Sequence, residues 1–223
     1  MNLIEYADRD ALMLGLANKI AGELRAALNH NDRATFCVPG GSTPGPVFET
    51  LSAVHLDWSR VDVMLNDERW VDETSPRSNT ALLKRTLLKD QAAAARMVPL
   101  YTDRPTPEEG LPLLLKGVKD ALPIDVLLLG MGTDMHTASL FPGADQLDLA
   151  LSDEAPELLA MRAPGAPEAR ITLSAQALKS AIATHLLITG DEKRAALETA
   201  RGASAQDAPV SLFLPEASVH WAA

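Results

Sequence analysis

The feature that most constrains the fold of this chain is a set of four short apolar runs spread along the sequence. They are Ala34–Val38, Val61–Leu65, Ile124–Leu129 and Thr184–Thr189. None of them shows the regular polar alternation of a strand with one face in solvent. Runs of this kind are typical of strands covered on both faces, as in a parallel sheet packed between helices.

Helical patterns separate these runs. The candidate N-caps that precede an apolar helical pattern are Asp8, Ser78 and Thr106. The first helix should run to about Leu28 and the second to about Leu88, and Pro112 predicts a kink or a later start in the third. Strands that alternate with helices predict one α/β domain over residues 1–223, Rossmann-like, with a doubly wound, mainly parallel sheet flanked by helices.

Shorter segments complete the predicted order. We expect extended segments at Leu158–Arg162 and Arg170–Leu173, helices after Ser174 and Gly190, and a last apolar stretch near Val210–Leu214.

Composition restricts the partners. The chain has 20 basic and 30 acidic residues, a formal net charge of −10, so its overall field repels polyanions and predicts no nucleic-acid partner. No segment is apolar and long enough to span a membrane, and the N-terminus lacks the order of a secretory signal. The single cysteine, Cys37, excludes an intramolecular disulfide and is expected to be buried and inert. These features predict a cytoplasmic protein with no membrane partner.

Polar or glycine-rich segments follow all four apolar runs. They are Pro39–Pro44, Asn66–Arg69, Gly130–His136 and Gly190–Lys193. Ligands of open parallel sheets bind outside the carboxyl ends of the strands. We therefore expect these four segments to meet around one crevice.

The first segment suits a phosphate group. Gly40, Gly41, Ser42 and Thr43 offer backbone N–H groups and hydroxyls just before a predicted helix. The segment lacks the lysine of a P-loop and the second glycine of a nucleophile elbow. By itself, the same stretch could also be an ordinary strand-to-helix turn.

Cofactor motifs are incomplete. Gly130-Met131-Gly132 resembles the start of a dinucleotide fingerprint, but Met135 occupies the position of the third glycine. The five histidines show no metal-ligand spacing. We expect neither a metal ion nor a cofactor.

His136 is the candidate base. A histidine side chain, with a usual pKa of about 6.5, can accept a proton at neutral pH. A lone loop histidine is more often structural, and it is the expected convergence of four loops that favours a catalytic role. Arg69, Arg170 and Lys193 could supply the local positive charge that an anionic substrate needs in an acidic protein.

At these residues the chain resembles the family of 6-phosphogluconolactonases, which is related to glucosamine-6-phosphate deaminase and shares its fold. The matching elements are Pro39–Pro44, Asp67–Val71 with Ser78-Asn79, Gly130–Gly132 through His136–Pro142, Arg170–Leu173, and Gly190–Lys193. The resemblance covers about residues 34–212 in the right order, and the stretch from His136 to Pro142 is its most specific part.

The resemblance implies roles for individual residues. A phosphate would be held by Gly41, Ser42, Thr43, Arg170 and Lys193, and Gly40 and Gly132 would also belong to the substrate-binding site. His136 would be the catalytic base. As a mechanism, we expect it to activate water at a lactone carbonyl, with Asp134 or Asp67 orienting the imidazole and Arg69 or the N–H groups of Gly130–Gly132 stabilising the oxyanion. The implied partner is a phosphorylated sugar lactone, and we expect a monomer or a homodimer.

Two alternatives remain open at this point. A deaminase or isomerase would use Asp67 as its base, but the deaminase pattern has Asp-Glu-Tyr where this chain has Asp67-Glu68-Arg69. That pattern also has an Asn-Glu pair where this chain has Ser139-Leu140-Phe141. A sugar-phosphate sensor without turnover is the second alternative. Met135 is a departure from the glycine usual before the histidine, and would be strained if its φ were positive.

Overall fold

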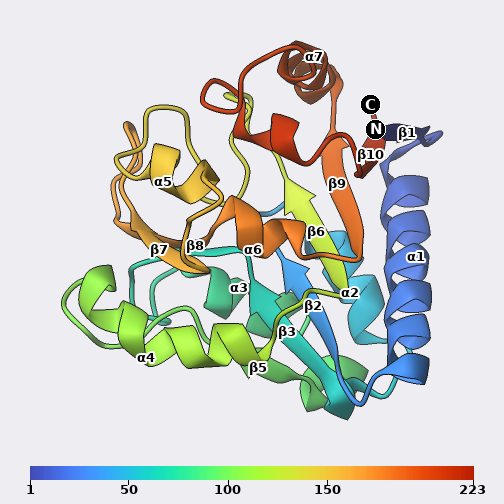
Figure 1. Ribbon diagram of the computed structural model, residues 1–223. Coiled ribbons are helices and arrows are strands. Elements are labelled where there is room, and N and C mark those ends of the chain that lie inside the picture. Colours follow the sequence, from blue (N-terminus) through green and yellow to red (C-terminus); the bar gives the residue numbers. More distant parts are fainter.

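In the computed structural model, which describes residues 1–223, the four apolar runs form the four central strands of a seven-stranded parallel sheet (Figure 1). The strand order is β1-β10-β9-β6-β2-β3-β5. The strands are β1 (Asn2–Glu5), β2 (Ala34–Val38), β3 (Val61–Leu65), β5 (Arg96–Val98), β6 (Val126–Gly130), β9 (Ala183–Thr189) and β10 (Ser218–Ala222). Every pair of neighbours in this sheet is parallel.

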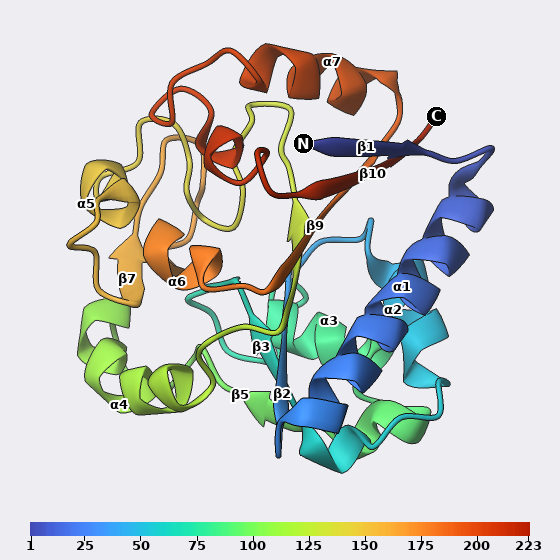
Figure 2. The ribbon, with the colours of Figure 1, turned by 45° about the vertical axis from the view of Figure 1, so that its right-hand side comes forward.

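Helices cover both faces of this sheet. Figures 1 and 2 show α1 and α2 on one side and α4 and α6 on the other. The helices are α1 (Arg9–His30), α2 (Gly45–Ser52), α3 (Asn79–Thr86), α4 (Pro107–Asp120), α5 (Leu147–Leu151), α6 (Ala175–Lys179) and α7 (Asp191–Ala200). The predicted side-chain caps of Asp8, Ser78 and Thr106 are present, each accepting from a backbone N–H three residues later. The predicted fold class is confirmed.

A second, smaller sheet lies beside the first. It has three antiparallel strands in the order β4-β8-β7, namely β4 (Asp67–Arg69), β8 (Arg170–Leu173) and β7 (Leu158–Met161). In this sheet Arg69 is paired with Arg170. The two extended segments predicted from the sequence are therefore strands, but they belong to this small sheet and not to the parallel one.

The packing forms one continuous apolar cluster of 56 buried residues. The strands β2, β3 and β6 are almost entirely inaccessible to solvent, as their uninterrupted apolar runs predict. Cys37 is fully buried, and burial raises the pKa of its thiol far above the usual range. No helix combines the length and the apolar character needed to cross a lipid bilayer.

The two ends of the chain meet in the parallel sheet. The last apolar stretch that we expected, near Val210–Leu214, forms a 3-10 helix over Pro209–Leu212. The final strand is β10, which lies between β9 and β1, the first strand of the chain. Figure 2 shows both termini beside this pair of strands. The third helix begins at Pro107, so Pro112 lies within it and does not delay its start.

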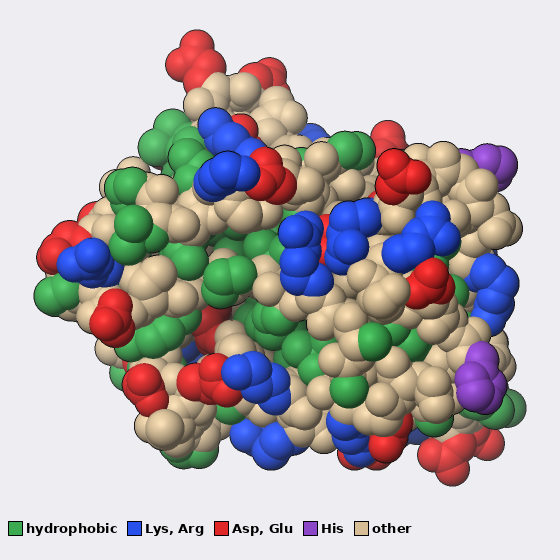
Figure 3. Space-filling view, turned by 90° about the horizontal axis from the view of Figure 1, so that it is seen from below, with side chains coloured by type: hydrophobic (Ala, Val, Ile, Leu, Met, Phe, Trp, Pro, Cys, Tyr) green, Lys and Arg blue, Asp and Glu red, His purple; other side chains and the backbone are tan.

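Charges of both signs are mixed on the face opposite the carboxyl ends of the central strands. Figure 3 shows basic side chains next to acidic ones on this face. Asp62, for example, accepts hydrogen bonds from both Arg33 and Arg96.

Candidate functional site

A cavity of about 260 Å³ lies at the carboxyl ends of the central strands. It is lined by residues that follow β2, β3, β6 and β9, together with Asn79 and Arg170. The strand order reverses between β2 and β6, because the chain first adds β3 and β5 on one side of β2 and then returns to add β6 on the other. At such a switch point the connections run to opposite faces of the sheet and leave a crevice. Residues from all four predicted segments line this one cavity, so the expected convergence is observed.

Most of the predicted site residues line this cavity. Those that do are Gly40, Gly41, Thr43, Asp67, Arg69, Gly132, His136, Arg170 and Lys193. Ser42 is exposed and does not line it. Asp134 does not line it either, but it contacts His136.

His136 is held by the loop after β6. Its Nδ1 atom lies 2.5 Å from Oδ1 of Asp134, and its ring stacks on Phe141 with 4.0 Å between centroids. A carboxylate can only accept, so Nδ1 carries the proton in the neutral imidazole and Nε2 is left as an acceptor. Burial opposes the charge of Asp134, but hydrogen bonding and charge attraction to His136 outweigh burial and lower the pKa of the carboxyl. The pair has the arrangement of a general base and its orienting carboxylate.

The backbone of this loop is unusual at Met135. Its φ is 64°, and Ala138 has a φ of 50°, so both lie in the left-handed region that side chains with a Cβ rarely adopt. The loop is held in this shape by the N–H of Met135, which donates to the carbonyl of Gly132, and by the N–H of Val210, which donates to the carbonyl of Met135. Met135 therefore has the positive φ at which we expected a methionine to be strained.

Gly132 leaves room for the His136–Asp134 pair. A Cβ on Gly132 would lie 2.2 Å from Oδ1 of Asp134 and 2.2 Å from Nδ1 of His136. Real contacts of that length do not occur, so any larger residue would displace the pair.

Arg170 reaches the cavity from β8 with donors to spare. Its Nη1 lies 3.5 Å from Asp67 and 3.5 Å from Ser139, and its buried Nε has no partner. Burial lowers the pKa of the guanidinium, an effect that Asp67 partly offsets. A buried donor without a partner is costly unless a ligand completes it.

Arg69 has the same feature. One of its terminal nitrogens donates to the carbonyl of Arg77, but its Nε is buried without a partner. Two unsatisfied guanidinium donors on one cavity indicate a site for an anion.

Lys193 enters the cavity from the first turn of α7. Its ammonium donates to the carbonyl of Met131 at 2.6 Å. Burial lowers its pKa, an effect partly offset by the negative charges of Asp134 and Glu192. The lysine therefore lies close to the loop that carries His136.

The loop after β2 presents backbone donors. Gly41 has a φ of 84°, and the N–H groups of Gly41, Ser42 and Thr43 form no hydrogen bond within the protein. Gly40 packs so closely on Asn79 that a Cβ would lie 2.1 Å from the amide oxygen. Free amide groups just ahead of α2 suit a phosphate.

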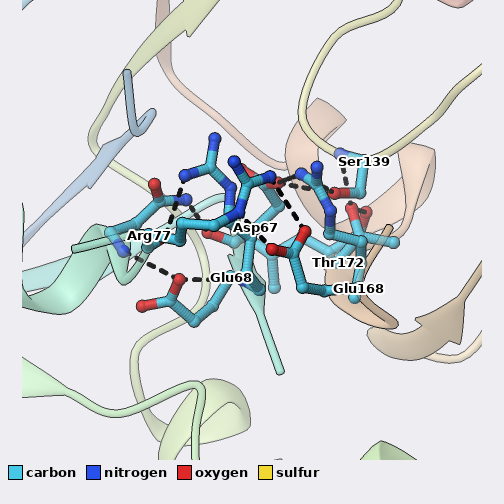
Figure 4. A network of polar contacts seen from close by, with 10 residues as sticks. Asp67, Glu68, Arg77, Ser139, Glu168 and Thr172 are labelled. Carbon is cyan, nitrogen blue, oxygen red and sulfur yellow. Dashed lines mark hydrogen bonds and ion pairs between the residues drawn. The ribbon is translucent and has the colours of Figure 1, made fainter. Parts of the chain in front are cut away.

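Glu68 acts behind the cavity. It is fully buried and accepts the backbone N–H groups of Arg69, Asn79 and Thr80 (Figure 4). Burial raises its pKa against these hydrogen bonds. Glu68 thus joins β4 to the start of α3 and places Asn79 on the cavity wall.

Of the polar residues Glu68, Arg77 and Asn79, only Asn79 lines the cavity. Arg77 pairs instead with Glu168 across two neighbouring loops. Asn66 also lines the cavity, and its buried Oδ1 has no partner. Asn66 directly follows β3, and this position at the carboxyl end of a parallel strand is the sequence signal that predicts it. No group of three or more histidine, cysteine or acidic side chains is arranged to hold a metal ion.

These features together define an α/β protein with a cavity at the switch point of its sheet, lined by His136, two arginines and Lys193. The chain matches the family described as glucosamine-6-phosphate isomerases/6-phosphogluconolactonase over residues 7–221, and it belongs to that family. The family resemblance seen in the sequence is confirmed.

Relatives and solved structures agree with this assignment. A 6-phosphogluconolactonase of Pseudomonas aeruginosa is 43% identical over 93% of this chain and 89% of its own length. One of Rhizobium meliloti is 39% identical over 99% of this chain and 98% of its own. The crystal structure of a 6-phosphogluconolactonase from Shewanella baltica superposes with a TM-score of 0.96 at 33% identity, covering 100% of this chain and 98% of the other.

Proposed function

We propose that this chain hydrolyses 6-phospho-D-glucono-1,5-lactone to 6-phospho-D-gluconate. The observation that carries the proposal is that His136, with Nε2 free to accept a proton, lines the same cavity as Arg69 and Arg170, whose buried Nε atoms lack partners. The names of the relatives support the same reaction. Water is the second reactant, so the reaction needs no cofactor.

His136 would act as the general base. Its Nε2 takes a proton from water while the water oxygen bonds to C1 of the lactone, and the same proton then passes to the ring oxygen as the C1–O bond breaks. Asp134 keeps Nδ1 protonated throughout, because it is the carboxylate that contacts the imidazole. Asp67, the other candidate, is engaged by Ser139 at 2.5 Å and by Arg170.

The oxyanion that forms at C1 needs donors within the cavity. Arg69 is the strongest candidate, because it lines the cavity and only one of its terminal nitrogens is engaged within the protein, by the carbonyl of Arg77. A positioned donor of this kind contributes about 10²–10³-fold to the rate.

The phosphate would lie between Arg170, Lys193 and the free N–H groups of Gly41 and Thr43, which line the same cavity. Binding energy from this remote group fixes the lactone relative to His136. An unphosphorylated lactone should therefore be opened poorly.

Deaminase or isomerase chemistry has less support. It would need Asp67 as a free base, but this carboxylate is held by Ser139 and Arg170 (Figure 4). In addition, the apolar ring of Phe141 stacks on the imidazole of His136, in the segment where the deaminase pattern has an Asn-Glu pair.

The test offers three compounds to the purified protein. We expect ring opening of the phosphorylated lactone well above the spontaneous rate, slow opening of the unphosphorylated lactone, and no ammonia from glucosamine 6-phosphate. Ammonia release would instead establish the deaminase. Thermal stabilisation by the sugar phosphates without turnover would establish a sensor.

A further inference from the structure

Phe141 contacts both His136 and Arg170, although it does not itself line the cavity. It stands five residues after His136 and directly before Pro142. Its ring stacks on the imidazole of His136 with an interplanar angle of 27°, and the guanidinium of Arg170 lies over the same ring at 5.4 Å from its centroid. One aromatic ring therefore touches both the candidate base and a candidate phosphate ligand.

The polar contacts of His136 do not fix its plane. The imidazole has one hydrogen-bonded neighbour, Asp134, whose own side chain is 53% exposed. A single hydrogen bond fixes the position of Nδ1, but the ring can still tilt about that point. The flat contact with Phe141 restricts this tilt, and with it the direction in which Nε2 points.

Arg170 is held just as loosely by polar groups. Its contacts with Asp67 and Ser139 are both 3.5 Å long, and its Nε has none. The face of Phe141 attracts the guanidinium without occupying any of its N–H groups. The donors stay free for an anion while the group is kept in place.

We propose that Phe141 is a positioning residue, which sets the relative orientation of the base His136 and the phosphate ligand Arg170. The inference rests on the proposed lactone hydrolysis. It assigns to Phe141 the alignment of water, base and bound lactone, and misalignment by about 1 Å can reduce a rate on the order of 10²-fold.

The test compares Phe141→Leu with Phe141→Tyr. Leucine keeps an apolar side chain but has no flat face, so we expect kcat to fall about 10- to 100-fold with a smaller rise in KM. Tyrosine keeps the ring and should restore kcat to within a few-fold of the unchanged protein. Phe48→Leu makes the same exchange in the buried part of α2, and should lower thermal stability without the loss in kcat.

A double variant separates positioning from general damage. If Phe141 acts through His136, adding Phe141→Leu to His136→Gln should cost little beyond the loss from His136→Gln alone. Fully additive losses, a Phe141→Leu enzyme as fast as the unchanged one, or failure of tyrosine to rescue would each overturn the inference. Full activity of His136→Gln would instead overturn the proposed role of His136, so the two failures are distinguishable.

Discussion

Nδ1 of His136 and Oδ1 of Asp134 lie 2.5 Å apart, and no other side chain forms a hydrogen bond with this imidazole. The two residues are separated by one position in the same loop, and their contact depends on the missing side chain of Gly132. The first two predictions follow from this arrangement.

Replacing Asp134 by asparagine should reduce kcat on the order of 10²-fold and leave KM nearly unchanged. An amide can donate to Nδ1, which would move the imidazole proton to Nε2 and remove the acceptor that faces the cavity. Steady-state kinetics with the phosphorylated lactone measure both constants. Asp148→Asn, at an exposed position of α5, is the matched control. Equal activity of the two variants would exclude Asp134 as the orienting group.

Gly132→Ala should abolish most activity while the protein still folds. The new Cβ would meet the His136–Asp134 pair at 2.2 Å, so the pair must move apart. Activity and thermal unfolding should be measured on the same preparation. Gly22→Ala in α1 has open space around its Cβ and should be fully active and up to about 1 kcal/mol more stable. A Gly132→Ala enzyme with normal kcat would show that the pair is not required in this geometry.

Lys193→Met should raise KM about 10- to 100-fold, with a smaller effect on kcat. A hydrogen bond to a charged group contributes about 1.5–3 kcal/mol, and methionine retains the length of the side chain without the charge. Binding of the product, followed by calorimetry, should weaken in parallel. Lys179→Met, at an exposed position in α6, serves as the control. Unchanged KM and product affinity would remove Lys193 from the phosphate site.

Stability should fall as the pH is lowered from about 6.5 towards 4, because of a buried histidine pair, His185 and His220, that does not line the cavity. His220 Nδ1 lies 2.9 Å from the hydroxyl of Tyr6, its Nε2 lies 3.0 Å from His185 Nδ1, and His185 Nε2 lies 2.6 Å from Glu23. All three contacts are satisfied when both histidines are neutral. Burial, followed by repulsion from His185, lowers the pKa of His220 to about 4.

The direction of this pH effect follows from the pKa of His220 in the unfolded and in the folded chain. The unfolded chain takes up a proton at a pKa of about 6.5 and the folded chain only at about 4, so the unfolded state gains protons first and stability is lost over that interval, by at most about 3 kcal/mol. Urea unfolding at pH 7.5 and pH 4.5 measures the loss. His220→Gln should reduce the difference between the two pH values, whereas the exposed His55→Gln should not. A difference that is the same in all three proteins would contradict the assignment.

The central strands could be predicted because both of their faces are buried, so that nearly all of their consecutive residues are apolar. The runs at Ala34–Val38 and Val61–Leu65 match β2 and β3 residue for residue. The strands at the edges could not be predicted in this way. β1 is half exposed, and β4 consists of three charged residues whose strand pairing depends on Arg170–Leu173, a hundred positions away.

The cavity could be predicted as a convergence of loops, because the carboxyl ends of parallel strands share one edge. Its finer geometry could not. The exposure of Ser42 depends on the shape of the loop after β2. The stacking of Phe141 on His136 and the left-handed backbone of Met135 depend on how the loop after β6 closes in three dimensions. No periodicity in the sequence carries that information.

The most direct test of the account is the rate of lactone opening by His136→Ala, corrected for the spontaneous reaction. The substitution removes the imidazole from the cavity and leaves Arg170 and Lys193 in place, so product should still bind and raise the unfolding temperature. We expect kcat to fall by about 10²–10⁴-fold. An undiminished kcat would contradict the assignment of His136 as the base that activates water.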